Sequence, residues 1–428
     1  MNGLIEKIVY PGRRLIRIQG KVIFTDLGLP GELVQVVPFR ERKSYAEART
    51  VKIIEPSLRR VAPRCRHYRV CSPYQEMDYG LQLEIKKAQI EEILAPVLHH
   101  PRPSIPIIPS PEKWGYRTKI TLRLFWEERG PSLAYYEPGE TNFFVPVDRC
   151  ALVPDDINDF AAGLRDLAAT GNSKSLNEIE IRLSRSSGRF LAVLKADSVR
   201  DLGDMAVSIP GLPAAAGLAG VVALIEKNGR RRKTILTGQE YLEEKIGGLT
   251  FSYGACSFFQ VNLGMLEVLI NDVKSALSEL SHPEVADLYC GVGTFGLSVS
   301  VSSAQVIGVE SDPENLRYLR KNVDLNGIRN FRVCQGKSEN RIISILDRRP
   351  QVVVLDPPRR GLAPSLVSAL SAKPVRKIIY VSCNPSTLAR DLARLSAVYA
   401  PEAIRAYDFF PHTPHIETMA VLSKRQRR

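Results

Sequence analysis

The sequence of 428 residues lacks long apolar runs, and none approaches the ~18–20 residues that a membrane-spanning helix needs. Its first ten residues, MNGLIEKIVY, lack the basic region and apolar core of a secretory signal. We therefore expect a cytoplasmic protein without membrane contact. Seven residues are cysteine, and without a secretory signal they argue against a disulfide framework.

The composition is ordinary for a globular protein, but the charge is not. Hydrophobic residues make up 44% of the chain and charged residues 25%. The length suggests two or three domains. The net charge is +13, and residues 1–70 alone hold fifteen Lys or Arg against six Asp or Glu. Such a region is typical of nucleic-acid binding, because these cations displace the counterions of a phosphate backbone. A solvated charged face is the alternative.

Residues 1–58 predict a small β-barrel. Apolar and polar positions alternate in the runs RLIRIQGKVIFTD, GELVQVVPF and EARTVKIIEP. The turn-forming residues Gly20, Pro30 and Gly31 interrupt this alternation. Three to five short strands at this spacing indicate a barrel of the OB type. The stretch KSYAEARTVKIIEPSLRRVAPRC resembles a TRAM domain, which is an RNA-binding barrel.

Residues 59–250 predict a mixed α+β central domain with RNA-contacting strands. Apolar residues recur at helical spacing in residues 80–98, and this amphipathic helix is expected to pack on the catalytic domain. Residues 116–250 contain several strand-like runs. From residue 283 the pattern changes to strand–loop–helix units, which predict a doubly wound α/β domain over residues 251–428. Ligands of such sheets bind beyond the carboxyl ends of the strands.

The loop DLYCGVGTFGL after the first of these strands predicts a cofactor site. Gly291 and Gly293 would let a ligand approach the backbone, and Glu310 ends the next strand, where an acid can accept hydrogen bonds from ribose hydroxyls. The loop has no third glycine at the dinucleotide spacing and no Lys-Ser/Thr for a triphosphate. The pattern favours S-adenosylmethionine over NAD or ATP. A simple tight turn is the alternative.

Three further residues form a candidate catalytic group. Asp356 lies in VVVLDPPRRG, where two prolines make the loop rigid. Cys383 follows the strand-like KIIYVS and precedes a helix, whose N-terminus favours a thiolate. Glu417 lies beside two histidines in a partly apolar loop, a setting that raises a carboxyl pKa towards that of a useful base. Taken singly, these residues could be loop acids and a core cysteine.

A methyl donor, a thiol and a carboxylate together suit methylation of uracil C5. This carbon is a poor nucleophile until a thiolate adds to the neighbouring C6. A base must then remove the C5 proton so that the thiol can leave. Cys383 and Glu417 would be that nucleophile and that base.

Five stretches resemble, in order, the motifs of the RNA 5-methyluridine methyltransferase family: SFFQVN, DLYCGVGTFGL, VLDPPRRG, VSCNPSTLARDL and FPHTPHIETMAVL. The family is that of class I S-adenosylmethionine-dependent methyltransferases. The resemblance implies Cys383 as nucleophile, Glu417 as base, and Phe258 as an aromatic that stacks on RNA. The cofactor-binding positions that it implies are Gln260, Tyr289, Gly291, Gly293, Thr294, Glu310 and Asp356. Thr294 stands where Asn is common. Lys337 replaces an acid that would accept a hydrogen bond from the adenine amino group of the cofactor, so that contact is not expected here.

Many TRAM-bearing relatives hold a [4Fe–4S] cluster on Cys-x5-Cys-x2-Cys and a later cysteine. This chain has Cys65, Cys71 and Cys150 at matching positions, but Tyr74 at the fourth, and a phenolate is a poor ligand for iron–sulfur clusters. Three retained cysteines favour a metal cluster. Residual cysteines around a lost cluster are the alternative.

The resemblance implies a monomer whose partner is RNA, with 23S rRNA as the leading substrate, since many tRNA-specialised relatives lack the barrel. The T-loop uridine of tRNA is the first alternative. A non-catalytic RNA-binding assembly factor is a remote one, because Cys383, Glu417, Gln260 and Asp356 are intact. An exocyclic-amine methyltransferase would need an aromatic residue where Arg359 follows the prolines.

Overall fold

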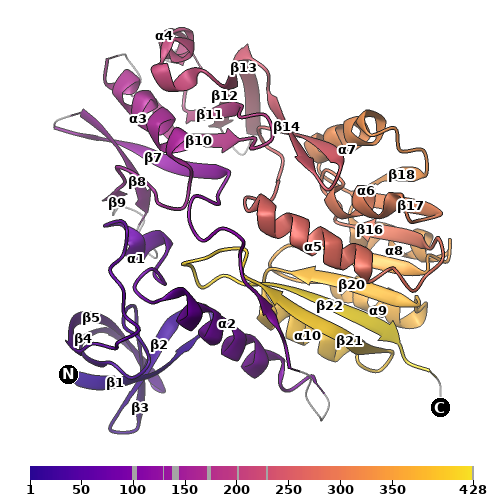
Figure 1. Ribbon diagram of the computed structural model, residues 1–428, viewed down its shortest axis with the longest axis horizontal. Coiled ribbons are helices and arrows are strands. Elements are labelled where there is room, and N and C mark those ends of the chain that lie inside the picture. Colours follow the sequence, from indigo (N-terminus) through magenta and orange to yellow (C-terminus); the bar gives the residue numbers. More distant parts are fainter. Residues whose placement is uncertain are drawn as a thin grey trace.

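The computed structural model describes residues 1–98, 104–128, 130–136, 144–170, 175–199, 202–227 and 230–426. The chain forms three parts: an N-terminal barrel, a central α+β domain and a C-terminal α/β domain (Figure 1). The N-terminus lies at the barrel and the C-terminus at the far side of the α/β domain. Within these residues, no helix is long and apolar enough to cross a membrane.

Five strands close the N-terminal barrel in the order β1-β2-β3-β5-β4. Their bounds are β1 Asn2–Val9, β2 Arg13–Ile18, β3 Lys21–Thr25, β4 Leu33–Glu41 and β5 Tyr45–Glu55. Side chains alternate between the two faces of each strand, so that Ile5, Ile16 and Ile23 fill the interior. The small closed barrel expected from the sequence is confirmed.

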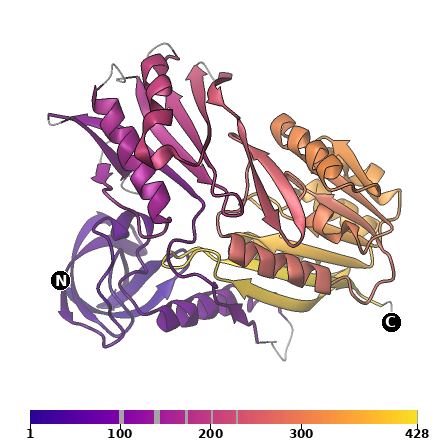
Figure 2. The same ribbon diagram turned by 45° about the horizontal axis from the view of Figure 1, so that its top comes forward.

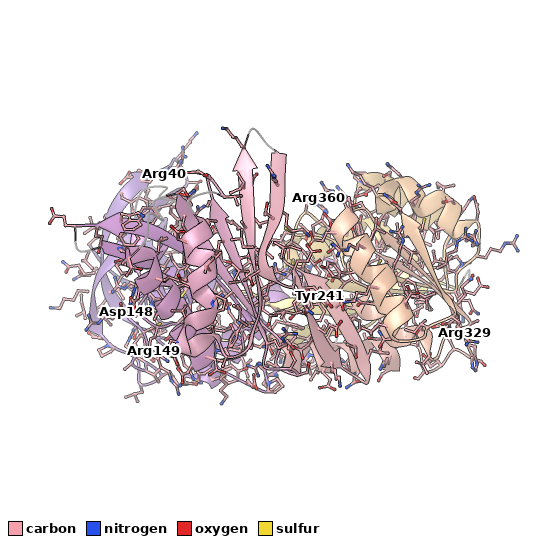
Figure 3. The ribbon with its side chains drawn as sticks, turned by 90° about the horizontal axis from the view of Figure 1, so that it is seen from above. Arg40, Asp148, Arg149, Tyr241, Arg329 and Arg360 are labelled. Atoms are coloured by element: carbon pink, nitrogen blue, oxygen red, sulfur yellow. The ribbon has the colours of Figure 1, made fainter. Side chains whose placement is uncertain are left out.

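The central domain is a seven-stranded sheet in the order β13-β12-β11-β10-β7-β8-β9. Its elements are β7 Lys119–Glu127, β8 Gly130–Tyr136, β9 Phe144–Pro146, α3 Asp155–Thr170, β10 Leu176–Leu183, β11 Phe190–Ala196, α4 Gly203–Ser208, β12 Leu218–Lys227 and β13 Arg230–Gly238. A hairpin of β14 Tyr241–Ile246 and β15 Leu249–Gly254 follows. From above, Tyr241 lies between the central and C-terminal domains, and its ring lies 6.3 Å from that of Tyr318 (Figure 3).

The C-terminal domain is an eight-stranded sheet in the order β18-β17-β16-β19-β20-β22-β21-β6. Its strands are β6 Ile107–Ile108, β16 Glu284–Leu288, β17 Gln305–Glu310, β18 Phe331–Gln335, β19 Val352–Leu355, β20 Lys377–Ser382, β21 Tyr399–Tyr407 and β22 Glu417–Lys424. Its helices are α5 Leu263–Ser275, α6 Thr294–Ser300, α7 Pro313–Leu325, α8 Ser338–Leu346, α9 Pro364–Ala372 and α10 Pro385–Leu395. The strand order reverses at β16, which creates a crevice at the carboxyl ends of β16 and β19. The doubly wound sheet is confirmed.

The segment before the central domain also packs on this sheet. Helix α2 runs from Tyr79 to Leu94, shorter than the predicted 80–98, and buries Ile90 and Leu94 in the core of the C-terminal domain. Strand β6, which lies in a proline-rich stretch, pairs with β21 at Ala406 and Tyr407. A short α1, Tyr68–Cys71, precedes both.

The loop of residues 408–416, between β21 and β22, leaves the sheet and reaches the barrel and α2 (Figures 1 and 2). Asp408 is fully buried and pairs with the equally buried Lys86 of α2. The Tyr79 hydroxyl donates to the other Asp408 oxygen over 2.8 Å. The Gln82 side chain accepts a hydrogen bond from the His412 backbone N–H at 2.9 Å. Helix α2 therefore holds the loop at several points.

We expect Lys86→Ala to lower the free energy of unfolding by about 3–5 kcal/mol, because Asp408 would be left buried and unpaired. Lys87→Ala is the matched control, since the Lys87–Glu91 pair is exposed and contributes about 0.5 kcal/mol or less. Urea unfolding of both variants measures the difference. Equal stabilities would show that the buried pair does not anchor the loop.

Candidate active site

The sheet register brings Cys383 and Glu417 together. Strand β20 ends at Ser382, which pairs with Thr418 of the antiparallel β22. Cys383 follows Ser382 at the start of a bend, and Glu417 is the residue before Thr418, so both residues lie at the end of this ladder. The charge of Glu417 raises the pKa of the Cys383 thiol, as expected of nearby groups. The Cys383 side chain is partly exposed, whereas Glu417 is only 3% exposed. A thiol and a buried carboxyl thus both lie at the carboxyl end of β20.

The residues after Cys383 tie it to the Asp356 loop. Asn384 caps α10 by accepting from the Ser386 backbone N–H at 3.1 Å. Its amide nitrogen donates to the Arg359 carbonyl at 3.1 Å, and the Thr387 hydroxyl donates to the same oxygen at 3.3 Å. The predicted catalytic loop and the cysteine turn are therefore a single hydrogen-bonded unit.

Burial keeps the Cys383 thiol protonated in the resting protein. Burial, followed by the charges of Glu417 and Asp356, raises the pKa of this thiol to about 11, while Arg359 acts in the opposite direction. The sequence predicted a thiolate favoured by the helix N-terminus. The structure differs because burial and two nearby carboxyl groups outweigh that effect.

The neighbouring acids also have raised pKa values. Burial, followed by the charge of Asp356, holds the pKa of Glu417 well above its usual range, as expected from the sequence, and Arg359 acts in the opposite direction. Burial raises the pKa of Asp356 to about 7. His412 and His415 are neutral, because burial lowers their pKa values to about 3 and about 4. Asp356, rather than either imidazole, therefore titrates near neutral pH.

Tyr289 and Glu310 line a cavity of about 150 Å³ at the switch point of the sheet. Its other lining residues are Val309, Ser311, Gly336, Lys337, Ser338, Glu339, Pro358 and Arg360. Glu310 accepts from the Gly291 backbone N–H at 2.9 Å, and the Tyr289 hydroxyl donates to Glu339 at 3.1 Å. Gly291 has a φ of +58° and open space where a Cβ would lie, so its backbone is accessible to a ligand.

The other predicted residues have different surroundings. Gly293 is needed for packing rather than for ligand approach, because a Cβ there would lie 2.6 Å from a Leu319 methyl carbon. Thr294 begins α6. Gln260 and Phe258 lie between β15 and α5, where Gln260 is buried and Phe258 is 62% exposed.

Sequence reasoning did not assign roles to Asp287 or Arg359. One carboxyl oxygen of Asp287 accepts a hydrogen bond from the Gly296 backbone N–H at 2.8 Å. Its other oxygen is buried and has no hydrogen-bond partner among the described residues. Burial raises its pKa to about 8. Asp287 is the first residue of the quoted glycine-rich loop, and Arg359 follows the two prolines. Both residues therefore stand inside motifs that are visible in the sequence, which could have identified them.

This set of groups fits S-adenosylmethionine. Glu310 supplies a carboxylate to the cavity, and the Gly291 backbone beside it is open. A nucleoside with a cationic substituent needs acceptors of this kind. The cavity also lies at the crevice where such sheets bind ligands.

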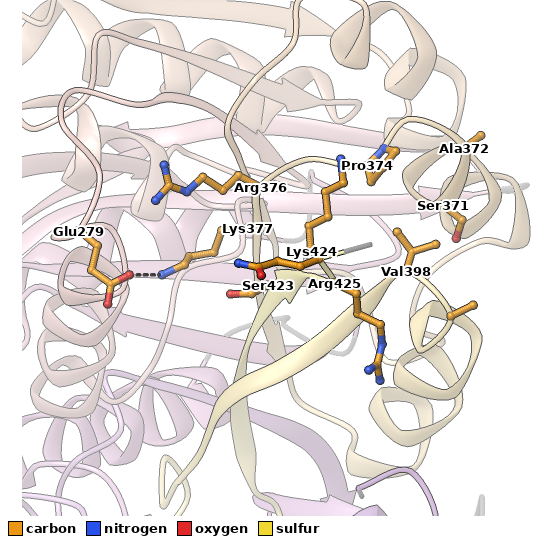
Figure 4. A pocket seen from close by; sticks show the side chains of 12 residues that line it. Glu279, Ser371, Ala372, Pro374, Arg376, Lys377, Val398, Ser423, Lys424 and Arg425 are labelled. Carbon is orange, nitrogen blue, oxygen red and sulfur yellow. Dashed lines mark ion pairs between the residues drawn. The ribbon is translucent and has the colours of Figure 1, made fainter. Parts of the chain in front are cut away.

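A larger cavity of about 990 Å³ lies at the opposite ends of β20 and β22 (Figure 4). Lys377, Lys424 and Arg425 line it, and Lys377 pairs with Glu279 at 3.6 Å. None of the predicted site residues lines this cavity, so size does not identify the active site.

The thiols of the three N-terminal cysteines make hydrogen bonds or close contacts with neighbouring side chains. Cys65 accepts from the Gln75 amide at 3.2 Å, Cys71 lies 3.2 Å from the Ser72 hydroxyl, and Tyr135 donates to Cys150 at 3.8 Å.

Tyr74 does not join these thiols. It is fully buried in the apolar cluster of Ile8 and Met77, where its hydroxyl accepts from the Gln89 amide. No group of three His, Cys, Asp or Glu side chains in the described part of the chain is arranged to hold a metal ion. The predicted cluster is therefore not supported.

A family model described as tRNA (uracil-5-)-methyltransferase matches residues 78–425. The chain belongs to this family. An uncharacterised RNA methyltransferase of Gloeobacter violaceus is 30% identical over 427 residues, covering 95% of this chain and 92% of its own. One from Synechocystis sp. is 30% identical over 439 residues, covering 98% and 94%. The family membership inferred from the five motifs is confirmed.

A solved structure shows the same fold over the whole chain. It is that of Pyrococcus abyssi tRNA (uracil-54, C5)-methyltransferase in complex with S-adenosyl-L-homocysteine, with a TM-score of 0.77 and 23% identity. The match covers 99% of this chain and 100% of that chain. The order of barrel, central domain and α/β domain is therefore shared with this tRNA methyltransferase.

We expect the Cys383 thiol to react slowly with iodoacetamide at neutral pH and faster as the pH rises towards about 11, because only the thiolate reacts. Mass spectrometry of tryptic peptides follows the reaction, and a Cys383→Ser variant identifies the peptide. An inflection below the ordinary thiol value of about 8.5 would contradict the raised pKa.

We also expect protein purified without oxygen to hold little iron or acid-labile sulfide and to lack the broad visible absorbance of a cluster, because Tyr74 is buried away from the thiols. Chemical analysis and absorbance spectra measure both quantities. About four irons per chain would show that the cysteines rearrange to bind a cluster.

Proposed function

We propose that this protein transfers a methyl group from S-adenosylmethionine to C5 of uridine in RNA, with Cys383 as nucleophile and Glu417 as base. The observation that carries the proposal is the β20–β22 register: Cys383 follows the last paired residue of β20, and the buried Glu417 precedes its partner Thr418 on β22. The cofactor cavity lies at the same end of the sheet, after β16 and β17. A uracil-C5 methyltransferase needs these three parts in one place.

In the proposed reaction, the Cys383 sulfur bonds to C6 of the base as its proton leaves to solvent. The electron pair of the C5–C6 double bond then resides on C5 and the adjacent carbonyl. S-adenosylmethionine, when bound, supplies the methyl group that C5 accepts. Glu417 next takes the proton of C5, the double bond re-forms, and the thiolate leaves. The Arg359 charge favours the ionised forms of both side chains, because it lowers the pKa of each.

The cofactor would be held by residues at the carboxyl ends of the strands. Tyr289 and Glu310 line the cavity of about 150 Å³, and the Gly291 backbone N–H donates to Glu310. Asp356 follows β19, and Pro358 of the same loop lines the cavity. Gln260 and Thr294 complete the set taken from the family motifs, and Gly293 lets the loop pack closely on Leu319. The complex of the Pyrococcus enzyme with S-adenosyl-L-homocysteine supports this cofactor.

The RNA would bind over the barrel and reach the site past Phe258. A cavity of about 670 Å³ on the barrel is lined by Arg13, Arg49 and Phe39, and the Phe39 side chain is 64% exposed. The Arg49 guanidinium lies 5.9 Å from the Phe39 ring centroid. Exposed aromatic and arginine side chains of this kind stack on unpaired bases. Phe258, also exposed, would stack on RNA displaced at the active site.

We propose 23S rRNA as the first substrate to test, because the barrel adds an RNA-binding surface to the catalytic domain. The T-loop uridine of tRNA is the second candidate. It is favoured by the Pyrococcus structure, whose match extends over the barrel and whose enzyme acts on tRNA uracil 54. Total rRNA and tRNA from a strain lacking 5-methyluridine, incubated separately with the protein and labelled cofactor, would distinguish them. Methylation of neither RNA would contradict the proposed function.

We expect Cys383→Ala to lower methylation roughly 10⁴-fold or more, because no covalent adduct can form. Glu417→Gln should instead accumulate a protein–RNA adduct that survives denaturation, because the C5 proton cannot be removed. Gel mobility after heating in detergent detects the adduct. Cys65→Ala is the control cysteine and should retain full activity. Wild-type activity of Cys383→Ala would exclude the mechanism.

A further inference from the structure

Tyr10 is a barrel residue that lies at the catalytic domain. It belongs to the turn between β1 and β2, which is closed by a 2.7 Å hydrogen bond from the Gly12 backbone N–H to the Val9 carbonyl. The Tyr10 side chain is partly buried and packs against the apolar cluster of the catalytic sheet. That cluster includes Ile416, the residue before Glu417. The barrel thus places an aromatic residue next to the strand that carries the proposed base.

The turn is held rigidly against the loop of residues 408–416. A Cβ added at Gly12 would lie 2.8 Å from Cβ of Pro414, so only glycine allows this approach. The Arg14 guanidinium, which is 1% exposed, donates to the Gly12 carbonyl at 2.7 Å and to Glu76 at 2.8 Å. Because its anchors are buried, the turn is held in a fixed position against this loop.

The charged neighbours of Tyr10 are groups of the proposed active site. Burial raises the pKa of its phenol, the charges of Cys383 and Glu417 raise it further, and Arg359 opposes them. The phenol therefore keeps its proton. Among the described residues, its hydroxyl has no hydrogen-bond partner. A neutral donor beside the nucleophile is thus available to a substrate.

We infer that Tyr10 contacts the target uracil and donates a hydrogen bond to the carbonyl oxygen that gains negative charge when Cys383 adds to C6. The inference rests on the proposed function. Addition at C6 moves electron density onto C5 and the conjugated O4, and a fixed donor stabilises such an oxyanion most in the transition state. The barrel would then complete the active site as well as bind RNA.

Tyr10→Phe tests this role, because the phenylalanine keeps the ring that packs on the catalytic domain and removes only the donor. Loss of one oxyanion donor costs about 10²-fold in kcat. We expect kcat and kcat/KM to fall equally and KM to stay unchanged, since the bond forms in the transition state. Tyr45→Phe is the matched control, because Tyr45 lies on the barrel and its ring contacts Phe24.

Two measurements on the full-length protein decide the outcome: single-turnover methylation of the RNA, and adduct formation in the Glu417→Gln background. Slowing of both by Tyr10→Phe, with Tyr45→Phe unchanged, supports the inference. Wild-type rates in Tyr10→Phe, or a rise in KM alone, would overturn it and leave the proposed function standing. No methylation and no adduct in any variant would overturn the proposed function and the Tyr10 inference together.

Discussion

The ion pair between Lys86 and Asp408 is the contact on which the arrangement of the three domains depends. Both side chains are fully buried, and burial alone would lower the pKa of Lys86, so each charge needs the other. Asp408 begins the loop of residues 408–416, which leads to Glu417 at the start of β22. The Pro411 carbonyl of this loop accepts a hydrogen bond from the Tyr116 hydroxyl of the central domain at 3.1 Å. Its His412 carbonyl accepts from the Tyr74 backbone N–H at 3.0 Å. One loop is therefore shared by all parts of the chain.

The proposed active site is built from strand ends and carries little charge at rest. Asp287, Asp356 and Glu417 all have pKa values raised by burial, and the Cys383 thiol is protonated. A buried cluster of acids is tolerable in this state because protonation removes most of their repulsion. A cationic ligand would reverse the balance, since a nearby positive charge favours the ionised forms. The electrostatics thus suit a site that is activated by binding.

Local sequence predicted the parts of this site that lie at strand ends, because a buried run followed by a polar turn is visible in the sequence. Cys383 and Asp356 are of this kind. The partners that come from far away in the chain were not predictable, since no local pattern pairs Lys86 with Asp408 or brings Tyr10 to Glu417. Tyr74 stands at a cysteine position of the spacing, and only the fold shows that its ring fills an apolar cluster. Gly293 also depends on a distant residue, because a Cβ there would meet Leu319 of another helix.

Strand β6 has a consequence for how the catalytic unit is assembled. It occupies the edge of the sheet beside β21, where unpaired backbone groups would otherwise be open to another chain. Helix α2 lies before it in sequence and covers the same domain. The central domain is therefore an insertion within a discontinuous catalytic unit. A fragment that begins after the insertion would lose its edge strand and uncover part of its core, so the methyltransferase domain cannot be separated by a single cut.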